Sequence, residues 1–527
     1  MKGTNNANVC KKMRLQRMMY PLVGKCEELY YDKKECIIVN NNEVLFDSAN
    51  SSISYCSYFN LFSYCKWRKY TRCTNIALEA WVKGDVEIAI TSIEYKRDQL
   101  SNKEYRVERV VANKYQRIEI DLSGIQGDFI GVIITAQEAL SSVRDIAFII
   151  PGTDDISFDD VRIGMCICTY KREKDVLDNL ELVRNRILDC DSSLVRDRIE
   201  VFVADNGCTL AETKNNHINI FHNRNYGGSG GFTRAAIEAL KSDVTHVLFM
   251  DDDVSFEPDV IERTYSFLSL LKPEYSEAFL GGAMLTKEVE YLQHAAGETD
   301  SIKGINFDKK NFDMRKLERI CACEEDAGSN YLAWWYCAIP REVFEQNGFS
   351  YPMFVQYDDI EFSIRNSNFT KINVNGIAVW HNDFEQKRSG VKDYYSLRNR
   401  LISHSICYGD FLLIRRWAEF VLKAIGRLRR GFFFEAMLII NAGFDYLKGP
   451  EYICNLDLEQ KNSELYAYNN RNDSPAKIIA WMVIPVRLLK LFLMLLLNRR
   501  KVIRKYRDTL SEYTSQEYWE SKLGLLV

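Results

Sequence analysis

Residues 161–170 read Val-Arg-Ile-Gly-Met-Cys-Ile-Cys-Thr-Tyr, a nearly unbroken apolar run. Runs of that kind are typical of a parallel strand that is covered on both faces. The patterns that follow are a helix at 174–188, a strand at 199–204, a Gly-rich loop at 226–231, a helix at 232–240 and a strand at 246–250. Strands and helices that alternate at this spacing imply βαβ units and a mostly parallel sheet, with ligands beyond the carboxyl ends of its strands.

The sequence on either side of this segment has a different texture. Short β-rich runs with period-two alternation fill 43–150, and no helical pattern intervenes, which predicts an antiparallel sandwich or barrel. After about Gly390 the chain reads as helices to the end. With 527 residues, more than one core is expected. We expect a β-sandwich domain at 1–155, an α/β domain at 156–390 and a helical region at 391–527.

Composition and charge exclude several classes of protein. The chain is 46% hydrophobic and 27% charged, which is typical of folded globular protein, and its net charge of -4 gives no general attraction to nucleic acid. No apolar stretch follows the basic start, so the sequence predicts no secretory signal. The 15 cysteines are therefore interpreted as reduced thiols of a cytosolic protein.

One segment near the end of the sequence is strongly basic. Residues 477–507 contain nine Lys or Arg and no Asp or Glu, around an apolar block at 488–497. This block is too short for the ~20 residues of a bilayer span, and Arg487 and Lys490 interrupt the pattern. A basic amphipathic segment on an anionic membrane surface is favoured. The alternative is a helix that packs on the protein and has a solvated basic edge.

Three acidic residues, Asp251, Asp252 and Asp253, follow directly on the apolar strand pattern at 246–250. Adjacent like charges disfavour one another, so the cluster needs a compensating cation. Hard divalent ions bind oxygen ligands and bridge to phosphates, which predicts a metal–diphosphate site. The alternative is a turn that caps the helix after Pro258. His381 closes another apolar run and is interpreted as a further metal ligand, because imidazole suits Mn²⁺ and similar ions.

Asp358 and Asp359 stand at the start of a predicted helix. Acids in a first turn are favourable for the helix dipole, so simple capping is one interpretation. The functional interpretation is a general base, for which Asp359 is our choice. The Gly-rich loop at 226–231 opens a helix, where a backbone can approach a phosphate closely. Trp334 and Trp335 are interpreted as a surface for sugar stacking, or alternatively as core residues.

Seven motifs occur in order along the chain. They are Thr169-Tyr170-Lys171-Arg172, Asp205-Asn206-Gly207, the Gly-rich loop at 226–231, the acidic triplet at 251–253, Trp334-Trp335, Asp358-Asp359-Ile360-Glu361 and Trp380-His381. In this order they resemble the family 2 glycosyltransferases, and look most like the galactofuranosyltransferases that build galactan. The resemblance is tightest at 164–401. It implies a GT-A catalytic domain between an N-terminal β-sandwich and a helical tail.

The resemblance also implies a role for each matching position. The donor nucleotide sugar would be bound by Thr169, Arg172, Asp205, Asn225, Gly227, Gly228 and Asp252. Asp251, Asp253 and His381 would ligate Mn²⁺ or Mg²⁺, and Asp359 would be the catalytic base. The acceptor would be bound by His294, Glu298, Trp334, Trp335, Tyr357 and Asp358. Tyr357 departs from the pattern, since that group tends to carry Trp there, so acceptor contacts are expected to differ.

The implied activity is inverting transfer of galactofuranose from UDP-galactofuranose to a glycan or lipid-linked glycan, on the inner face of the plasma membrane. The implied partners are the UDP-sugar, the acceptor and an anionic membrane surface. A homo-oligomer is compatible with these roles, and nucleic acid is not expected as a partner. A rhamnosyltransferase or other hexosyltransferase on the same scaffold is the first alternative. A carbohydrate-binding or assembly protein and a nucleotide hydrolase are the others.

Overall fold

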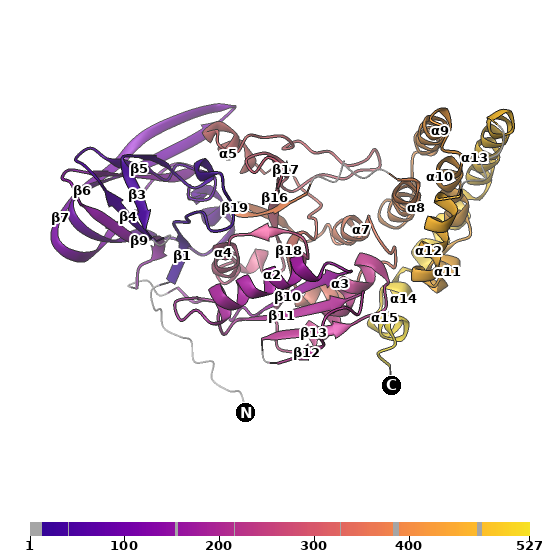
Figure 1. Cartoon of the computed structure of the whole chain (residues 1–527), viewed down its shortest axis with the longest axis horizontal. Helices are drawn as coiled ribbons and strands as arrows, with labels where there is room; N and C mark the ends of the chain where they lie inside the picture. The colour runs from indigo at the N-terminus through magenta and orange to yellow at the C-terminus, as the bar shows by residue number, and fades with distance from the viewer. Residues whose placement is uncertain are drawn as a thin grey trace.

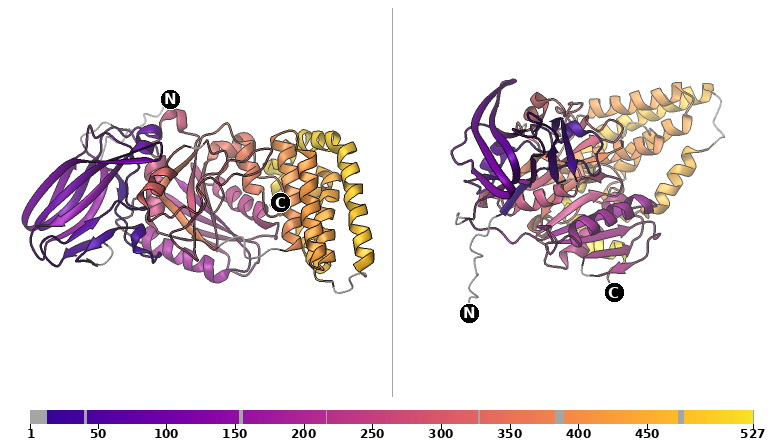
Figure 2. Two further views of the ribbon diagram at one scale, coloured as in Figure 1. Left: turned by 90° about the horizontal axis from the view of Figure 1, so that it is seen from above. Right: turned by 60° about the vertical axis from the view of Figure 1, so that its left-hand side comes forward.

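A computed structural model describes residues 13–39, 42–152, 156–215, 217–326, 328–382, 389–471 and 477–526. Three parts follow one another along the long axis of the molecule (Figure 1). The first is a β-sheet, the second is a sheet with helices around it, and the third is a group of helices that lie side by side at the far end (Figure 2). The mixed α/β character with two sheets and a helical C-terminal part agrees with the sequence prediction.

The first sheet has nine strands, and every described pair in it is antiparallel. Its order is β2 (Asp32–Lys34), β5 (Ser52–Ser54), β8 (Phe129–Ala136), β6 (Ala77–Lys96), β9 (Ser142–Ile150), β4 (Glu43–Phe46) and β3 (Cys36–Val39), with β1 (Met13–Arg17) on β9 and β7 (Gln99–Asp121) on β6. The expectation that no helix intervenes is wrong, because α1 (Tyr64–Tyr70) lies between β5 and β6. Seven residues are too few to display a helical period, and the helix is fixed by Trp67, which is fully buried.

The second sheet has ten strands and is more mixed than predicted. Its order is β12 (Thr213–Lys214), β13 (Ile218–His222), β11 (Ile199–Asp205), β10 (Ile163–Thr169), β14 (His246–Asp251), β18 (Tyr336–Pro340), β16 (Phe279–Thr286), β19 (Lys371–His381) and β15 (Ser255–Phe256), with β17 (Gln293–Ala295) on β16. Strands β10, β11, β13 and β14 are parallel, as are β16 and β19. β18 runs antiparallel to both of its neighbours. Because that one strand separates two sets with the same direction, the carboxyl ends of β10, β11, β14 and β19 share one edge.

Helices cover this second sheet and connect its strands. They are α2 (Glu173–Val183), α3 (Gly227–Leu240), α4 (Asp259–Leu268), α5 (Leu317–Cys323), α6 (Arg341–Asn347) and α7 (Asp358–Arg365). α3 packs against β10, β11 and β14, and α4 packs against β19 and against β1 of the first sheet. The α4 contact with β1 joins the first two parts of the molecule.

The C-terminal part is helical, which confirms the prediction for this stretch. Its helices are α8 (Gly390–Cys407), α9 (Leu413–Arg429), α10 (Phe433–Leu447), α11 (Pro450–Asn455), α12 (Leu458–Asn469), α13 (Lys477–Asp508), α14 (Leu510–Thr514) and α15 (Gln516–Leu523). α10 packs against α8, α9 and α13. α15 turns back onto α3, where the buried Trp519 donates a hydrogen bond from Nε1 to the carbonyl of Ser350 at 3.0 Å.

The apolar part of helix α13 is longer than the sequence predicted. The segment Ile478–Asp508 is long and apolar enough, by length and composition, to cross a membrane, and its best 18-residue window has a mean hydropathy of 2.1. The sequence prediction counted only the block at 488–497, whereas the helix runs without a break through Pro485 from the apolar residues before it. Some core helices of soluble proteins are equally long and apolar, and 28% of this 18-residue stretch is buried against the rest of the protein.

Candidate active site

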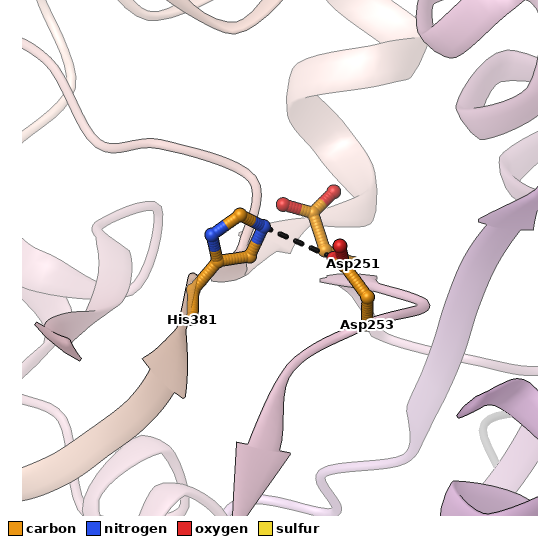
Figure 3. Close-up of side chains that lie close together, drawn as sticks. All are labelled: Asp251, Asp253 and His381. Carbon is orange, nitrogen blue, oxygen red and sulfur yellow. Dashed lines mark ion pairs between the residues drawn. The ribbon is translucent and has the colours of Figure 1, made fainter. Parts of the chain in front are cut away.

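Two strand ends meet at the shared edge of the second sheet. After Asp253 the chain forms β15, which is the outermost strand next to β19, and there Ser255 pairs with Trp380 of β19. This pairing brings the acidic triplet beside His381, the last residue of β19. Nε2 of His381 lies 3.0 Å from Oδ1 of Asp253, and the ligand atoms of Asp251, Asp253 and His381 all lie within 4.8 Å of one another (Figure 3). The structure thus brings together the three residues that the sequence suggested as metal ligands.

The electrostatics of this trio fit a divalent cation. Burial raises the pKa of Asp251 to about 7, and the charges of Asp253 and Asp252 add to the effect while His381 opposes it. Burial is the largest single influence on Asp253 and His381, but the hydrogen bond between them and the neighbouring charges together outweigh it, so that the pKa of Asp253 is lowered and that of His381 is raised. A bound cation would stabilise both carboxylates in their charged form.

The orientation of the imidazole also suits metal binding. Nδ1 of His381 lies 2.6 Å from the carbonyl oxygen of Asn382, which leaves Nε2 facing the carboxylates. Metal-bound histidines commonly donate their second ring N–H to such a carbonyl. Two oxygen ligands and one imidazole form a donor set for a divalent metal.

The acidic loop is held by side chains from other elements. Nη1 of Arg172 lies 2.8 Å from Oδ1 of Asp252 and 2.5 Å from Oδ2 of Asp253. Nδ2 of Asn179 on α2 donates to the carbonyls of Asp252 and Val254, at 3.1 and 3.0 Å. Sequence reasoning found Arg172 but missed Asn179, whose signal would have been a buried amide on the inner face of a predicted helix. Arg172 and Asn179 therefore fix the loop that carries the trio.

Asp205 and Thr169 end neighbouring strands in register with each other. The carboxylate of Asp205 is fully buried. It accepts three backbone hydrogen bonds, from the N–H groups of Gly207 at 2.9 Å, Thr209 at 2.6 Å and Leu210 at 2.7 Å. The structure therefore gives Asp205 the task of ordering the loop after β11.

The glycine-rich start of α3 packs against the segment that leads into α7. Gly227 has a φ of +67°, and a Cβ there would lie 2.1 Å from the carbonyl oxygen of Phe354. A Cβ on Gly228 would lie 2.9 Å from Oδ2 of Asp358. Oδ1 of Asn225 accepts a hydrogen bond from the N–H of Gly227 at 3.1 Å. Glycine is needed at 227 because the backbones of the two segments touch there, and at 228 because the Asp358 carboxylate lies against the chain.

Asp358 and Asp359 open α7, as predicted, and both have raised pKa values. Burial and the charge of Asp359 raise the pKa of Asp358 well above its usual range. Burial raises the pKa of Asp359 to about 6, against the opposing hydrogen bond from Tyr331. The hydroxyl of Tyr331 donates to Oδ2 of Asp359 at 2.9 Å. Sequence reasoning missed Tyr331, because no motif marks it.

The charge of Asp359 acts both on one member of the metal trio and on one of the predicted acceptor residues. Its charge contributes to the raised pKa of Asp251. Burial raises the pKa of Glu298 to about 8, and the charge of Asp359 adds to it. Glu298 accepts a hydrogen bond from the N–H of Ala296 at 2.9 Å, next to His294 on β17. Asp359 is therefore within electrostatic reach of both Asp251 and Glu298.

The two tryptophans are buried rather than exposed on an open surface. Trp334 is 4% exposed and packs on Phe249 and Phe232, with ring centroids 4.6 and 5.4 Å apart. Trp335 is 7% exposed and donates from Nε1 to the carbonyl of Gly282 at 2.9 Å. For Trp334 in particular the structure favours the core interpretation that the sequence left open.

The backbone before α7 is strained. Phe354, Gln356 and Tyr357 have φ values of 77°, 65° and 70°, in the left-handed region that residues other than glycine rarely adopt. Each such residue costs on the order of 1–3 kcal/mol, and conformations of this kind cluster at functional sites. Tyr357 is the residue directly before Asp358, so the strain lies next to the predicted base.

Comparisons with known proteins agree with this geometry. The model described as galactofuranosyltransferase 2 N-terminal matches residues 15–149, and the glycosyl transferase family 2 model matches residues 165–275. Galactofuranosyltransferase GlfT2 of Mycobacterium tuberculosis is 26% identical over 77% of this chain and 66% of its own length. The protein of that name from Mycolicibacterium smegmatis is 26% identical over 67% of this chain and 57% of its own length. The chain thus spans just under two thirds of the length of the first relative and less of the second.

Solved structures show weaker likeness. A mannosyltransferase from Pyrobaculum calidifontis, in complex with GDP-Man and Mn²⁺, is 13% identical over 66% of this chain and 90% of its own, with a TM-score of 0.29. Mannosyl-3-phosphoglycerate synthase from Rubrobacter xylanophilus is 13% identical over 43% and 68%, with a TM-score of 0.24. In the two family models that match it and in the two curated relatives, the chain is similar to the galactofuranosyltransferases of glycosyltransferase family 2.

Proposed function

We propose that this chain is an inverting GT-A glycosyltransferase that moves galactofuranose from UDP-galactofuranose to a glycan or lipid-linked glycan acceptor. The observation that carries the proposal is the convergence of Asp251, Asp253 and His381 at one sheet edge, within electrostatic reach of Asp359. A rhamnosyltransferase or other hexosyltransferase on this scaffold would share the metal site and differ in the donor pocket.

The donor side would be built from the strand ends and the loops after them. Asp251, Asp253 and His381 would hold Mn²⁺ or Mg²⁺, which when bound supplies Lewis-acid neutralisation of the charge that develops on UDP. Arg172 is half exposed and offers N–H donors to a diphosphate. The remaining predicted donor contacts are Thr169, the loop ordered by Asp205, Asn225, Gly227, Gly228 and Asp252.

The acceptor side would be centred on Asp359. Its carboxylate would take the proton of the acceptor hydroxyl as that hydroxyl attacks the anomeric carbon from the face opposite UDP, which inverts the configuration. Tyr331 stabilises the carboxylate and orients it. Asp358 has a raised pKa and would offer an O–H to the acceptor sugar. His294, Glu298, Trp335 and Tyr357 would line the remainder of the acceptor site, with Trp334 supporting them from the core.

A donor panel with and without EDTA tests the proposed activity. UDP-galactofuranose, other UDP-sugars and dTDP-sugars are each incubated with a lipid-linked oligosaccharide, and both transfer and release of free nucleotide are measured. We expect transfer from UDP-galactofuranose alone, loss of transfer in EDTA, and recovery with Mn²⁺. Transfer only from a dTDP-sugar would move the assignment to the rhamnosyltransferase alternative. UDP release at the same rate without acceptor would indicate a hydrolase instead.

Tyr331→Phe should shift the pH dependence of transfer. Asp359 accepts a proton only when ionised, so the rate falls as the pH drops through its pKa of about 6. Loss of the Tyr331 hydroxyl removes a bond that stabilises the charged form, so the acidic limb of the kcat/KM profile should move up by about one pH unit. An unchanged limb would show that the titrating group is not the carboxylate that Tyr331 contacts.

We also propose that the three parts divide at 155 and 390 and that the last part contacts a membrane surface. α13 exposes a row of large apolar side chains, Ile478, Trp481, Met482, Val486, Leu489, Leu493, Leu496 and Leu497, ahead of the basic residues of its last turns. That face supports peripheral binding to the anionic inner face of the plasma membrane, or burial in a homo-oligomer. Cosedimentation with anionic vesicles that weakens with salt is expected, and a lack of binding at low salt would contradict the membrane proposal.

A further inference from the structure

The segment 353–357, which we call the left-handed turn, connects the two halves of the proposed site. It leads directly into Asp358 and Asp359, and three of its residues have positive φ. Buried backbone carbonyls need hydrogen-bond partners, and side chains supply them for Met353, Val355 and Gln356 of this turn. The contacts that hold the turn therefore decide where α7 begins.

Helix α8, from the C-terminal part of the chain, supplies most of these contacts. Nδ2 of Asn399 lies 3.2, 2.8 and 2.9 Å from the carbonyl oxygens of Met353, Val355 and Gln356. Nη2 of Arg398 donates to the carbonyl of Met353 at 2.8 Å. The two side chains therefore bind carbonyls along most of the turn.

Arg398 also fixes the orientation of the Asn399 amide. Nε of Arg398 donates to Oδ1 of Asn399 at 2.9 Å, so the oxygen of the amide is occupied and its NH₂ group faces the turn. Both side chains are fully buried. Because water does not reach this buried site, loss of one donor would leave backbone carbonyls without a hydrogen-bond partner.

The opposite side of the turn is bound to the glycine-rich start of α3. Oγ of Ser229 accepts from the N–H of Phe354 at 2.9 Å, and the N–H of Ser229 donates to the carbonyl of Phe354 at 3.2 Å. The turn thus lies between α3, on the proposed donor side, and α8. A shift of the turn would change the position of the Asp359 carboxylate while leaving the metal trio on β14 and β19 in place.

We propose that Asn399 and Arg398 are positioning residues that hold the left-handed turn and thereby set the Asp359 carboxylate in its working position. The C-terminal helical part then completes the catalytic site, although none of its residues needs to touch the substrate. The inference rests on the proposed function of Asp359 as the base. It concerns kcat, because the proposed donor contacts lie on other elements.

Asn399→Ala tests this proposal, with Ser405→Ala as the matched control. Ser405 is also fully buried on α8, where it bonds Leu401 and Tyr446 and does not contact the turn. We expect Asn399→Ala to lower kcat by about 10- to 100-fold, since a misplacement of about 1 Å can cost that much. The donor KM and the affinities for UDP and Mn²⁺ should stay within about twofold, and Ser405→Ala should keep its kcat. An unchanged kcat, or a parallel loss of kcat, UDP affinity and melting temperature, would overturn the proposal.

Two further variants separate positioning from general destabilisation. Asn399→Asp keeps the side-chain size and removes the N–H donors, so it should show the same selective loss of kcat even where the alanine variant folds poorly. Gln356→Gly, added to Asn399→Ala, should recover part of kcat, because glycine adopts positive φ without strain. Failure of that rescue would overturn the role of the turn. Full activity in Asp359→Asn would instead show that Asp359 is not the base. An inactive Asp359→Asn beside a fully active Asn399→Ala would contradict only the positioning role of Asn399 and Arg398.

Discussion

Replacing Asp359 by Asn is expected to lower the rate of sugar transfer by about 10³-fold or more, in the upper range for loss of a general base. Asn keeps the size of the side chain and an oxygen that can accept the hydrogen bond from Tyr331. What it loses is the capacity to take a proton. With a pKa of about 6, Asp359 is largely ionised at neutral pH and still basic enough to accept the acceptor proton.

The measurement that checks this result is single-turnover transfer alongside UDP binding by calorimetry. UDP affinity should remain within a few-fold of the wild type, because the predicted nucleotide contacts lie at the ends of β10, β11 and β14 and at the start of α3 rather than on α7. The melting temperature serves as the folding control. Transfer at the wild-type rate in a correctly folded Asp359→Asn preparation would exclude Asp359 as the base.

Replacing His381 by Ala should weaken Mn²⁺ binding by at least about 100-fold and abolish transfer at micromolar metal. The magnitude follows because loss of a residue that only supports a metal ligand already costs 10- to 100-fold in affinity. His381 contacts Asp253 directly, so its loss also leaves two buried carboxylates with less compensating charge.

Metal binding can be measured without catalysis, by electron paramagnetic resonance of free Mn²⁺. His222→Ala is a suitable control, because His222 ends β13 at the same edge of the sheet, is exposed, and is not one of the trio. EDTA should reproduce the phenotype of His381→Ala in the wild type. Equal Mn²⁺ affinity in His381→Ala and wild type would contradict the three-residue site.

The trio could be predicted because strand ends carry information that is local in sequence. An apolar run followed by Asp251, Asp252 and Asp253 indicates a strand and its edge together, and His381 closes another such run. The 3.0 Å approach of His381 to Asp253 depends on the pairing of β15 with β19. A strand of two residues is too short to be predicted from the sequence. The direction of β18 could not be predicted either, since a five-residue apolar strand reads the same in both directions.

Contacts between side chains distant in sequence account for what was missed. Tyr331 is 28 residues from Asp359, and Asn399 is 43 to 46 residues from the carbonyls it binds. Trp334 shows the opposite difficulty, because an aromatic pair beside a polar motif has the same sequence signature in a groove wall and in a core. The aromatic rings of Phe232 and Phe249 that pack on Trp334 separate the two, and they are visible only in the structure.

The return of α15 to α3 makes the order of parts along the chain differ from their order in space. Trp519 is inserted beside the glycine-rich helix start, and Lys522 on the same helix donates to the carbonyls of Cys454 and Leu456 at 2.6 and 2.8 Å. Helix α15 therefore attaches the C-terminal helical part to the second sheet and its helices. A chain shortened before 510 would lose these contacts, and the helical part would then be held less firmly against the second sheet.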